Sequence, residues 1–331
     1  MSNSLPQSMR VIATTAPGGP EVLQTAERPL PKLEAGDVLI RVSGAGVNGP
    51  DLWQRKGLYP PPAGATDLLG LEISGEVVAC GNDAARWKVG DRVAALTNGG
   101  GYAQYCAVDA RHCLPIPSGV SLQDAAGLPE TFFTVWSNIF MTARLAAGET
   151  LLVHGGAGGI GTTAIQLAKA FGAKVIATDS PETRCKICRD LGADRVIDYR
   201  NEDFVEVVRS EGGANVILDI VGGPNIERNI KAASHDARIV QLAFGQGSKV
   251  EINLMPVMLK RLIYTGSTLR TRSPVFKAKI AEELEAKVWP HISSGRIRTV
   301  TGKTFPLAEA AKAHALMESS QHTGKILLIV N

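Results

Sequence analysis

The sequence predicts an α/β protein with a β-rich module and a domain built on a doubly wound parallel sheet. Its 331 residues correspond to about two domains at roughly 100–200 residues each. The first third of the chain reads as short strands broken by Gly and Pro. From about Ala125, helix-period segments alternate with short apolar runs, which is the pattern of βαβ units.

The strands expected in the first third are short and rich in β-branched residues. They cover residues 37–48, 71–82 and 91–97. Gly, Asn and Asp stand at their ends, and the third strand follows a Gly-Asp turn. This spacing is typical of a barrel-like all-β module.

The later strands are buried runs of the kind found in parallel sheets. They cover residues 149–155, 173–179, 195–200, 215–222, 237–245 and 262–269. Between the first two, Ala164, Leu167 and Phe171 fall on one face of a helix that Gly172 ends. Two helices, 274–293 and 307–319, and a last strand from Lys325 follow.

The composition excludes several classes of protein. Lys and Arg total 35 against 32 Asp and Glu, so the net charge of +3 is too small for a nucleic-acid binder. No apolar run approaches the ~18–20 residues of a membrane span. Five scattered cysteines are too few for a disulfide framework and indicate a reducing compartment, so the expected location is cytoplasmic.

A glycine pattern indicates a dinucleotide site. Gly156, Gly158 and Gly161 form G-x-G-x-x-G between a predicted strand and a predicted helix, with Gly159 and Ile160 inside the motif. The first glycine allows a tight turn, the second allows backbone to approach a pyrophosphate, and the third lets helix and strand pack. The helix N-terminus then faces the anion.

The choice between NAD and NADP is left open by the residues after the next strand. Asp179, which Ser180 follows, would accept hydrogen bonds from an adenosine ribose and repel a 2′-phosphate. Arg184 and Tyr199 would instead hold that phosphate. A third interpretation makes Asp179 a helix N-cap beside Pro181.

With these residues placed, the chain resembles the medium-chain dehydrogenase/reductase superfamily from about Met9 to its end. It is similar to the zinc-free quinone oxidoreductases, and most to their p53-inducible quinone oxidoreductase-like branch. The resemblance implies a GroES-like catalytic domain (1–125 and 270–331) interrupted by a Rossmann domain (126–269). The segments that carry it are Asn48-GPDLWQRKGL-Tyr59, Leu69-GLEISGEV, Trp87-KVGDRV, Gly99-GGYAQY, Leu128-PETFFTVW, the glycine pattern and Ser267-TLRTRS.

The resemblance also implies that zinc is absent. Zinc members of the superfamily have Cys where this chain has Asn48 and His where it has Leu71. Cys185 and Cys188 form C-x-x-C on a predicted helix without a second pair, which favours core or surface cysteines over a metal site. Without a Lewis acid, alcohol oxidation loses its usual driver, and reduction of a good hydride acceptor remains.

By resemblance, four residues line the nicotinamide and substrate pocket: Asn48, Asp51, Gln54 and Tyr59. Asn48 and Gln54 would hydrogen-bond a quinone oxygen or the carboxamide, and Tyr59 would donate a proton or cap the pocket. Asp51 has an equal alternative as a helix-start residue after Pro50.

Five more residues are placed near the cofactor by resemblance or by their position at a strand end: Thr134, Phe244, Gly245, Arg270 and Lys325. Thr134 has a packing alternative and Phe244 a core alternative. Arg270 and Lys325 have the alternative of solvated surface residues.

These features predict an NAD(P)H-dependent, zinc-independent oxidoreductase that acts on a quinone or similar conjugated carbonyl. NADP(H) is favoured, and Asp179 keeps NAD(H) in consideration. The alternatives are an enoyl or alkenal (C=C) reductase and a non-enzymatic dinucleotide-binding protein. The apolar strand at 262–269 would be a sheet edge, so we expect a homodimer through this edge, with no nucleic-acid or membrane partner.

Overall fold

The computed structural model describes residues 5–331 and separates them into two compact units. One comprises residues up to Phe133 together with Arg270–Asn331, and the other is Thr134–Leu269. The chain thus enters the second unit from the first and returns to it. The sequence predicts the first boundary at 125/126, whereas these units divide between Phe133 and Thr134.

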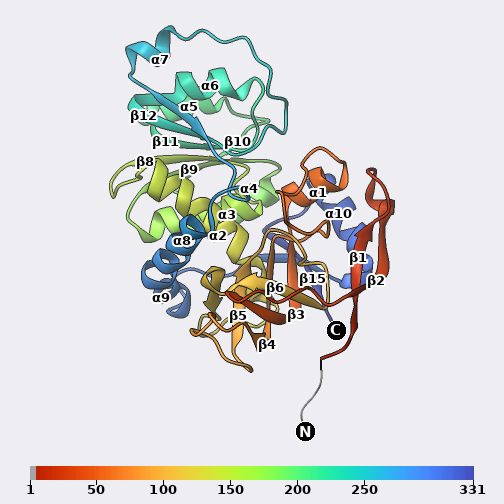
Figure 1. The fold of residues 1–331 in the computed structure, drawn as a ribbon. Helices are drawn as coiled ribbons and strands as arrows, with labels where there is room; N and C mark the ends of the chain where they lie inside the picture. The colour runs from red at the N-terminus through yellow and green to blue at the C-terminus, as the bar shows by residue number, and fades with distance from the viewer. Residues whose placement is uncertain (1–4) are drawn as a thin grey trace. The chain divides into compact units, whose positions relative to one another are not determined.

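The first unit is built on a mostly antiparallel sheet to which both chain ends contribute (Figure 1). Its strand order is β14-β15-β3-β4-β5-β7, with β6 paired to β3, and β1 pairs with β2 in a separate ribbon. Only the β14–β15 pairing in this unit is parallel among the described strands. The strands are β1 (Ser8–Thr14), β2 (Leu23–Pro29), β3 (Asp37–Val47), β4 (Glu72–Cys80), β5 (Arg92–Leu96), β6 (Tyr105–Asp109), β7 (Cys113–Pro115), β14 (Thr301–Pro306) and β15 (Lys325–Ile329).

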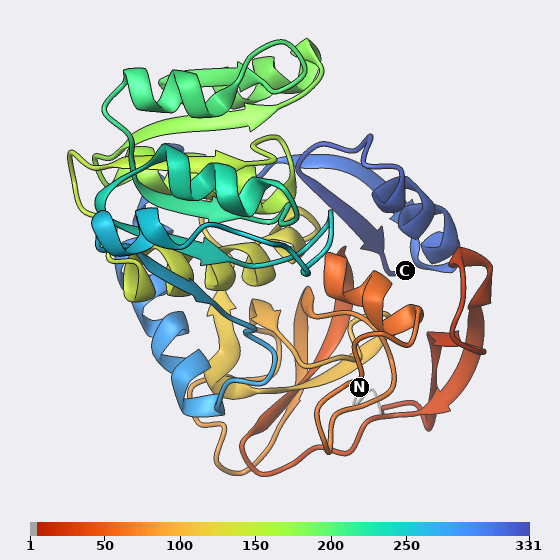
Figure 2. The ribbon, with the colours of Figure 1, turned by 90° about the horizontal axis from the view of Figure 1, so that it is seen from above.

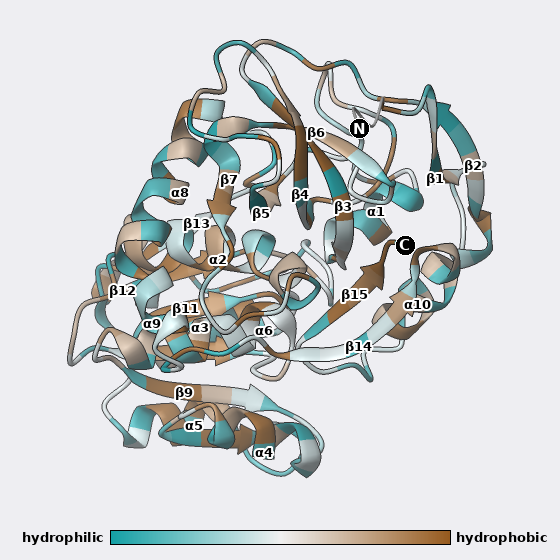
Figure 3. Cartoon of the chain, turned by 90° about the horizontal axis from the view of Figure 1, so that it is seen from below, coloured by the Kyte–Doolittle hydropathy of each residue, from teal (hydrophilic) through white to brown (hydrophobic). Residues whose placement is uncertain are grey.

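The core of this unit forms where strands from the two chain ends meet. Ile326 and Leu328 of β15 are fully buried beside Ala45 and Val47 of β3. Figure 3 shows β15 as hydrophobic along its length after its first residue, Lys325. That run of apolar residues fits a strand buried on both faces, and it leaves Lys325 as a charged group at the start of a buried strand.

The second unit confirms the doubly wound parallel sheet. All strand pairings are parallel, in the order β10-β9-β8-β11-β12-β13. The direction of winding reverses between β8 and β11, where open α/β sheets bind ligands. Helices α3 and α4 cover one face, and α5 and α6 cover the other (Figures 1 and 2). The strands are β8 (Thr150–His154), β9 (Lys174–Asp179), β10 (Arg195–Asp198), β11 (Ala214–Asp219), β12 (Ala233–Gln241) and β13 (Ile263–Gly266).

The helices are short and lie between or after the strands. In chain order they are α1 (Gly49–Arg55), α2 (Pro129–Val135), α3 (Gly159–Ala170), α4 (Glu182–Asp190), α5 (Phe204–Ser210), α6 (Asn225–Ala232), α7 (Met255–Leu259), α8 (Pro274–Lys287), α9 (Trp289–Ser293) and α10 (Ala310–Glu318). Single 3₁₀ turns and one π-helical segment, Trp136–Thr142, complete the described chain. Among residues 5–331 there is no helix with the length and apolar character needed to span a membrane.

Candidate active site

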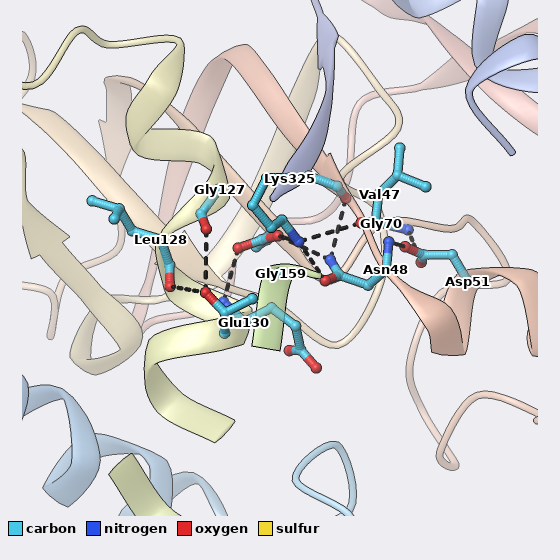
Figure 4. Close-up of polar contacts among 12 residues, drawn as sticks. Val47, Asn48, Asp51, Gly70, Gly127, Leu128, Glu130, Gly159 and Lys325 are labelled. Atoms are coloured by element: carbon cyan, nitrogen blue, oxygen red, sulfur yellow. Dashed lines mark hydrogen bonds and ion pairs between the residues drawn. The ribbon is translucent and has the colours of Figure 1, made fainter. Parts of the chain in front are cut away.

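The ammonium group of Lys325 contacts Glu72 and Asn48 in a cluster of polar side chains in the first unit (Figure 4). Its Nζ lies 2.6 Å from Oε1 of Glu72 and donates to Oδ1 of Asn48 at 2.6 Å. Asn48 Nδ2 donates to the same Glu72 oxygen at 2.9 Å. Glu72 is fully buried, so the ion pair with Lys325 and these hydrogen bonds offset the cost of removing its carboxylate from water. The surface alternative for Lys325 is wrong, because only 7% of the residue is exposed.

Gly46 leaves room for the side chain of Glu72. A Cβ at this position would lie 2.0 Å from Oε1 of Glu72. The glycine in β3 therefore lets the carboxylate of β4 approach the neighbouring strand closely enough to reach Asn48 and Lys325.

Asp51 fixes the start of α1 in the described structure. Its Oδ2 accepts the backbone N–H of Asn48 at 2.9 Å, which completes a capping box, and its Oδ1 accepts that of Gly70 at 3.0 Å. The helix-start role predicted for Asp51 is confirmed. Burial raises the pKa of this carboxyl to about 6, and the amide bonds from Gly70 and Asn48 oppose the rise.

A buried chain of donors ends on Asp51. Arg55 carries only donors, so the 3.3 Å contact between its Nη1 and Nδ1 of His314 makes this ring nitrogen an acceptor. The other ring nitrogen, Nε2, then donates to Tyr102 Oη at 3.0 Å, and Tyr102 donates to Asp51 Oδ2 at 3.3 Å. Burial and the nearby Arg55 lower the pKa of His314 to about 3, so the ring is neutral.

Arg270 organises a second polar group in the first unit. Its Nη1 donates to Oε1 of Gln54 at 2.7 Å, and its Nε and Nη2 donate to the carbonyl oxygen of Asn98. The guanidinium lies 5.7 Å from the ring centroid of Tyr59. Gln54, Tyr59 and Arg270 are thus brought together, and the surface alternative for Arg270 is wrong because the residue is 7% exposed.

Lys277 of α8 donates hydrogen bonds to both Asn98 and Arg270. Its buried Nζ donates to Oδ1 of Asn98 at 2.6 Å and to the carbonyl oxygen of Arg270 at 2.8 Å. Burial lowers the pKa of Lys277 to about 8. Burial likewise raises the pKa of the Tyr59 phenol, and the cation of Arg270 partly opposes this.

The glycine turn of the second unit is shaped for an anion. Gly156 and Gly161 have no room for a side chain, since a Cβ at Gly161 would lie 2.3 Å from the carbonyl oxygen of Gly155. Gly158 caps α3 without a side-chain hydrogen bond, so the first-turn amides at Gly159 and Ile160 have no helical acceptor. This glycine-lined helix start fits a dinucleotide pyrophosphate.

Asp179 ties the end of β9 to this turn. Its Oδ2 accepts the amide of Ala157 at 2.7 Å, and its Oδ1 accepts Arg184 Nε at 2.6 Å and the amide of Ser180 at 2.8 Å. The N-cap alternative is wrong, because α4 has Pro181 at its N-cap. The half-exposed Tyr199 lies one residue past β10, whose Asp198 is paired in register with Asp179.

Three further predicted residues lie elsewhere in the second unit. Phe244 and Gly245 are not part of a strand, because β12 ends at Gln241; they belong to a loop whose Gly245 and Gln246 amides bond to the segment after β11. Phe244 is 41% exposed, so its core alternative is wrong. Thr134 is the first residue of this unit, and its carbonyl oxygen accepts Asn138 Nδ2 at 2.8 Å.

Four of the five cysteines are buried, and Cys80 is partly exposed. Cys185 and Cys188 are buried on α4, as the core alternative predicted, and Sγ of Cys188 is close to the backbone of Gly156. Leu71, at the position where zinc members have His, is a buried apolar residue. Across residues 5–331, no three His, Cys, Asp or Glu side chains are grouped so that they could hold a metal ion.

Sequence reasoning missed several members of the site, above all Glu72 and Glu130. Glu130 is the second residue of α2, and its backbone N–H donates to Oε2 of Glu72 at 2.8 Å. An acid within the apolar run Leu71-Glu72-Ile73 is a signal of a buried charge that could have identified Glu72. No local signal marks Lys277, His314 or Tyr102, because their partners are distant in sequence.

Comparison with known proteins places the chain among oxidoreductases. Residues 34–118 match the alcohol dehydrogenase GroES-like domain, and residues 159–286 match the family described as zinc-binding dehydrogenase. A quinone oxidoreductase of Pseudomonas aeruginosa is 32% identical over 326 residues, 96% of this chain and 98% of that protein.

Two solved structures show the same fold. The Escherichia coli quinone oxidoreductase complexed with NADPH has a TM-score of 0.86 at 29% identity, covering 97% of this chain and 99% of that one. The CurK enoyl reductase has a TM-score of 0.86 at 25% identity, covering 98% and 100%. The predicted GroES-like and Rossmann fold is thereby confirmed.

The buried ion pair gives a prediction about stability. Lys325→Met removes the only cation that contacts Glu72 among the described residues, so we expect the free energy of unfolding to fall by about 3–5 kcal/mol in urea denaturation. Adding Glu72→Gln should recover much of the loss, because the buried charge is gone. As a control, Arg261→Met breaks an exposed pair with Asp236 and should cost less than about 1 kcal/mol. A loss from Lys325→Met no larger than that of the control would contradict this assignment.

Proposed function

The chain belongs to the medium-chain dehydrogenase/reductase superfamily, with quinone oxidoreductases among its full-length relatives, and we propose that it is an NADPH-dependent, zinc-independent quinone reductase. The observation that carries the proposal is the Lys325–Asn48–Glu72 cluster. At the position where zinc members of the superfamily have a cysteine thiolate ligand, this chain has the amide of Asn48, which is hydrogen-bonded to the ammonium group of Lys325. The resemblance of the quoted motifs also supports the p53-inducible quinone oxidoreductase-like branch.

Bound NADPH would supply the hydride, and the residues of the chain would bind and orient the reactants. In the second unit, the first-turn amides of α3 receive the pyrophosphate. In the first unit, Asn48 and Gln54 present amides to the acceptor oxygen, while Tyr59 closes over it. Asp51 positions Asn48 through the capping box rather than contacting the substrate, because both of its oxygens are engaged within the protein.

A C=C reductase is the second candidate, because a structural relative is an enoyl reductase and needs the same cofactor. A binding protein without turnover is the third. The free thiols of all five cysteines support a cytoplasmic location for each of the three candidates.

The test of function follows NADPH oxidation with an ortho-quinone, a para-quinone and an alkenal in parallel. We expect turnover of a quinone, since a quinone accepts hydride without a Lewis acid. Turnover of the alkenal alone would favour the C=C reductase, and no turnover with any acceptor would favour the binding protein. Gln54→Leu should lower kcat/KM for the quinone about tenfold or more by removing a hydrogen bond to the acceptor.

We also propose NADP(H) as the preferred cofactor. The Asp179 carboxylate is neutralised by Arg184 and engaged by the amides of Ala157 and Ser180, which leaves it little capacity to bind ribose hydroxyls or repel a phosphate. Arg184 and the half-exposed Tyr199 would contact the 2′-phosphate.

Arg184→Gln tests this preference. It should lower kcat/KM for NADPH by about 10- to 100-fold and leave the value for NADH nearly unchanged, because a charged hydrogen bond to phosphate contributes roughly 1.5–3 kcal/mol. Arg189→Gln, on the same helix and paired with Glu182, is the matched control. An equal loss with both cofactors would mean that Arg184 serves only the fold.

A second copy of the chain is the partner we propose for the edge of the parallel sheet. Strand β13 ends the sheet order, and Ile263 is 57% exposed on it. Met255, Met258 and Leu259 of the neighbouring α7 are also exposed, so an apolar surface continues beside the edge. Pairing of two β13 strands would extend the sheet and cover this surface.

Sedimentation velocity at micromolar concentration should show a dimer, and Ile263→Lys should give a monomer because it places a charge in the paired edge. Lys249→Glu, at an exposed position in the same unit, is the control and should leave the dimer intact. A wild-type protein that sediments only as a monomer would count against the pairing.

A further inference from the structure

Glu130 stands at the start of α2 and is bound through its backbone to the Lys325 cluster. Its N–H donates to Oε2 of Glu72 at 2.8 Å, while Oε1 of Glu72 is held by Lys325 and Asn48. The backbone of Glu130 is therefore fixed relative to Asn48, one of the residues expected to orient the substrate.

The carboxyl group of Glu130 itself has no such bond. Within residues 5–331, no side chain or backbone group donates a hydrogen bond to it and no cation pairs with it. In Figure 4 the carboxyl group of Glu130 carries no dashed line. The residue is only partly buried, so this carboxyl group is free to meet a bound molecule.

The other candidate acids and cations in this unit are already engaged. Asp51 accepts on both oxygens, and Lys325 and Lys277 donate to protein oxygens. The Tyr59 phenol has a raised pKa, which makes it a poorer acid. Glu130 is thus the acid of this polar site that has a free oxygen.

Burial and two neighbouring carboxylates keep Glu130 protonated, and two ammonium groups act against them. Burial, followed by the nearby carboxylates of Glu72 and Asp51, raises the pKa of Glu130 to about 8, and the ammonium groups of Lys325 and Lys277 oppose part of the rise. When it ionises, Glu130 adds to the rise in the pKa of Tyr59 and opposes the burial that lowers the pKa of Arg270, beside Gln54. Glu130 is therefore in electrostatic reach of the residues expected to bind the acceptor.

We propose that Glu130 is the proton donor of the reaction: its carboxyl group would protonate the quinone oxygen as hydride reaches the conjugated ring. This role rests on the proposed function. It adds a catalytic residue to a site in which Asn48, Gln54 and Tyr59 orient the acceptor.

The step is balanced. Reduction of a quinone to a hydroquinone takes one hydride and one further proton. The hydride would leave dihydronicotinamide with the electron pair of its C–H bond and form a C–H bond at a carbon of the conjugated ring, so that NADPH is oxidised and the quinone is reduced. The anionic oxygen that forms would take the proton from the O–H bond of Glu130. Loss of the ring-carbon proton to water and protonation of the second oxygen then complete the hydroquinone without a further change of oxidation state. The resulting Glu130 carboxylate regains a proton from water before the next turnover.

The experiment compares wild type, Glu130→Gln and Glu130→Asp in single-turnover and steady-state reduction of a quinone over a range of pH. For wild type, kcat should be constant at low pH and fall above about pH 8, because the acid form of Glu130 is the active one. Glu130→Gln should lower kcat about 100-fold and abolish the alkaline fall, with KM for NADPH within about threefold. Glu130→Asp should restore the alkaline fall at a reduced rate.

The matched control is Glu76→Gln on β4, where the acid pairs with Arg41 at the surface. It should leave the rate and the pH profile unchanged. Infrared difference spectra of wild type minus Glu130→Gln give a readout that does not depend on turnover. They should show the carbonyl band of a protonated carboxylic acid at pH 7, which disappears as the pH rises past about 8.

Two outcomes would overturn the role of Glu130 while the proposed function stands. One is a Glu130→Gln variant that reduces quinone as fast as active wild type or keeps its alkaline fall. The other is an infrared spectrum showing Glu130 ionised at pH 7. Wild type that reduces no quinone would instead overturn the proposed function itself.

Discussion

The first unit depends on one buried charge pair, Lys325 with Glu72. Glu72 is fully buried and Lys325 nearly so, and such charges persist in a protein interior only when hydrogen bonds satisfy them. Asn48 hydrogen-bonds to both side chains, and the backbone N–H of Glu130 donates to the second carboxylate oxygen of Glu72. One electrostatic requirement thereby connects the last strand of the chain with β4, the start of α1 and the start of α2.

A second set of buried hydrogen bonds reaches Asn48 from its backbone side. The donor chain from Arg55 through His314 and Tyr102 ends on Asp51, which in turn holds the backbone of Asn48. Because Arg55 can only donate, every hydrogen bond along this chain has a fixed direction. The side chain of Asn48 is then positioned from two sides, by Lys325 and by the capping box.

In the second unit, geometry rather than charge type decides how an acidic residue functions. An acid after the second strand of a dinucleotide fold usually indicates ribose binding. Asp179 instead bonds to Arg184, only five positions ahead in the chain, and to the amide of Ala157 in the glycine turn. Its carboxylate therefore stabilises the turn that would receive the pyrophosphate, which makes an acid at this position compatible with the proposed preference for NADP(H).

The sequence by itself predicted the parallel sheet, the glycine turn and the strands β3, β4, β5 and β15, because periodicity and turn chemistry are properties of neighbouring residues. It did not predict β1, β2, β6, β7 or β14. It offered a helix start as one of two roles for Asp51, and it favoured core or surface positions over a metal site for Cys185 and Cys188. Only the tertiary structure decided that Lys325 and Arg270 are buried and that Glu72 and Glu130 belong to the site. Lys325 and Asn48 are 277 positions apart in the chain. A lysine or arginine read alone suggests the surface, and burial becomes evident only when the fold brings its partner beside it.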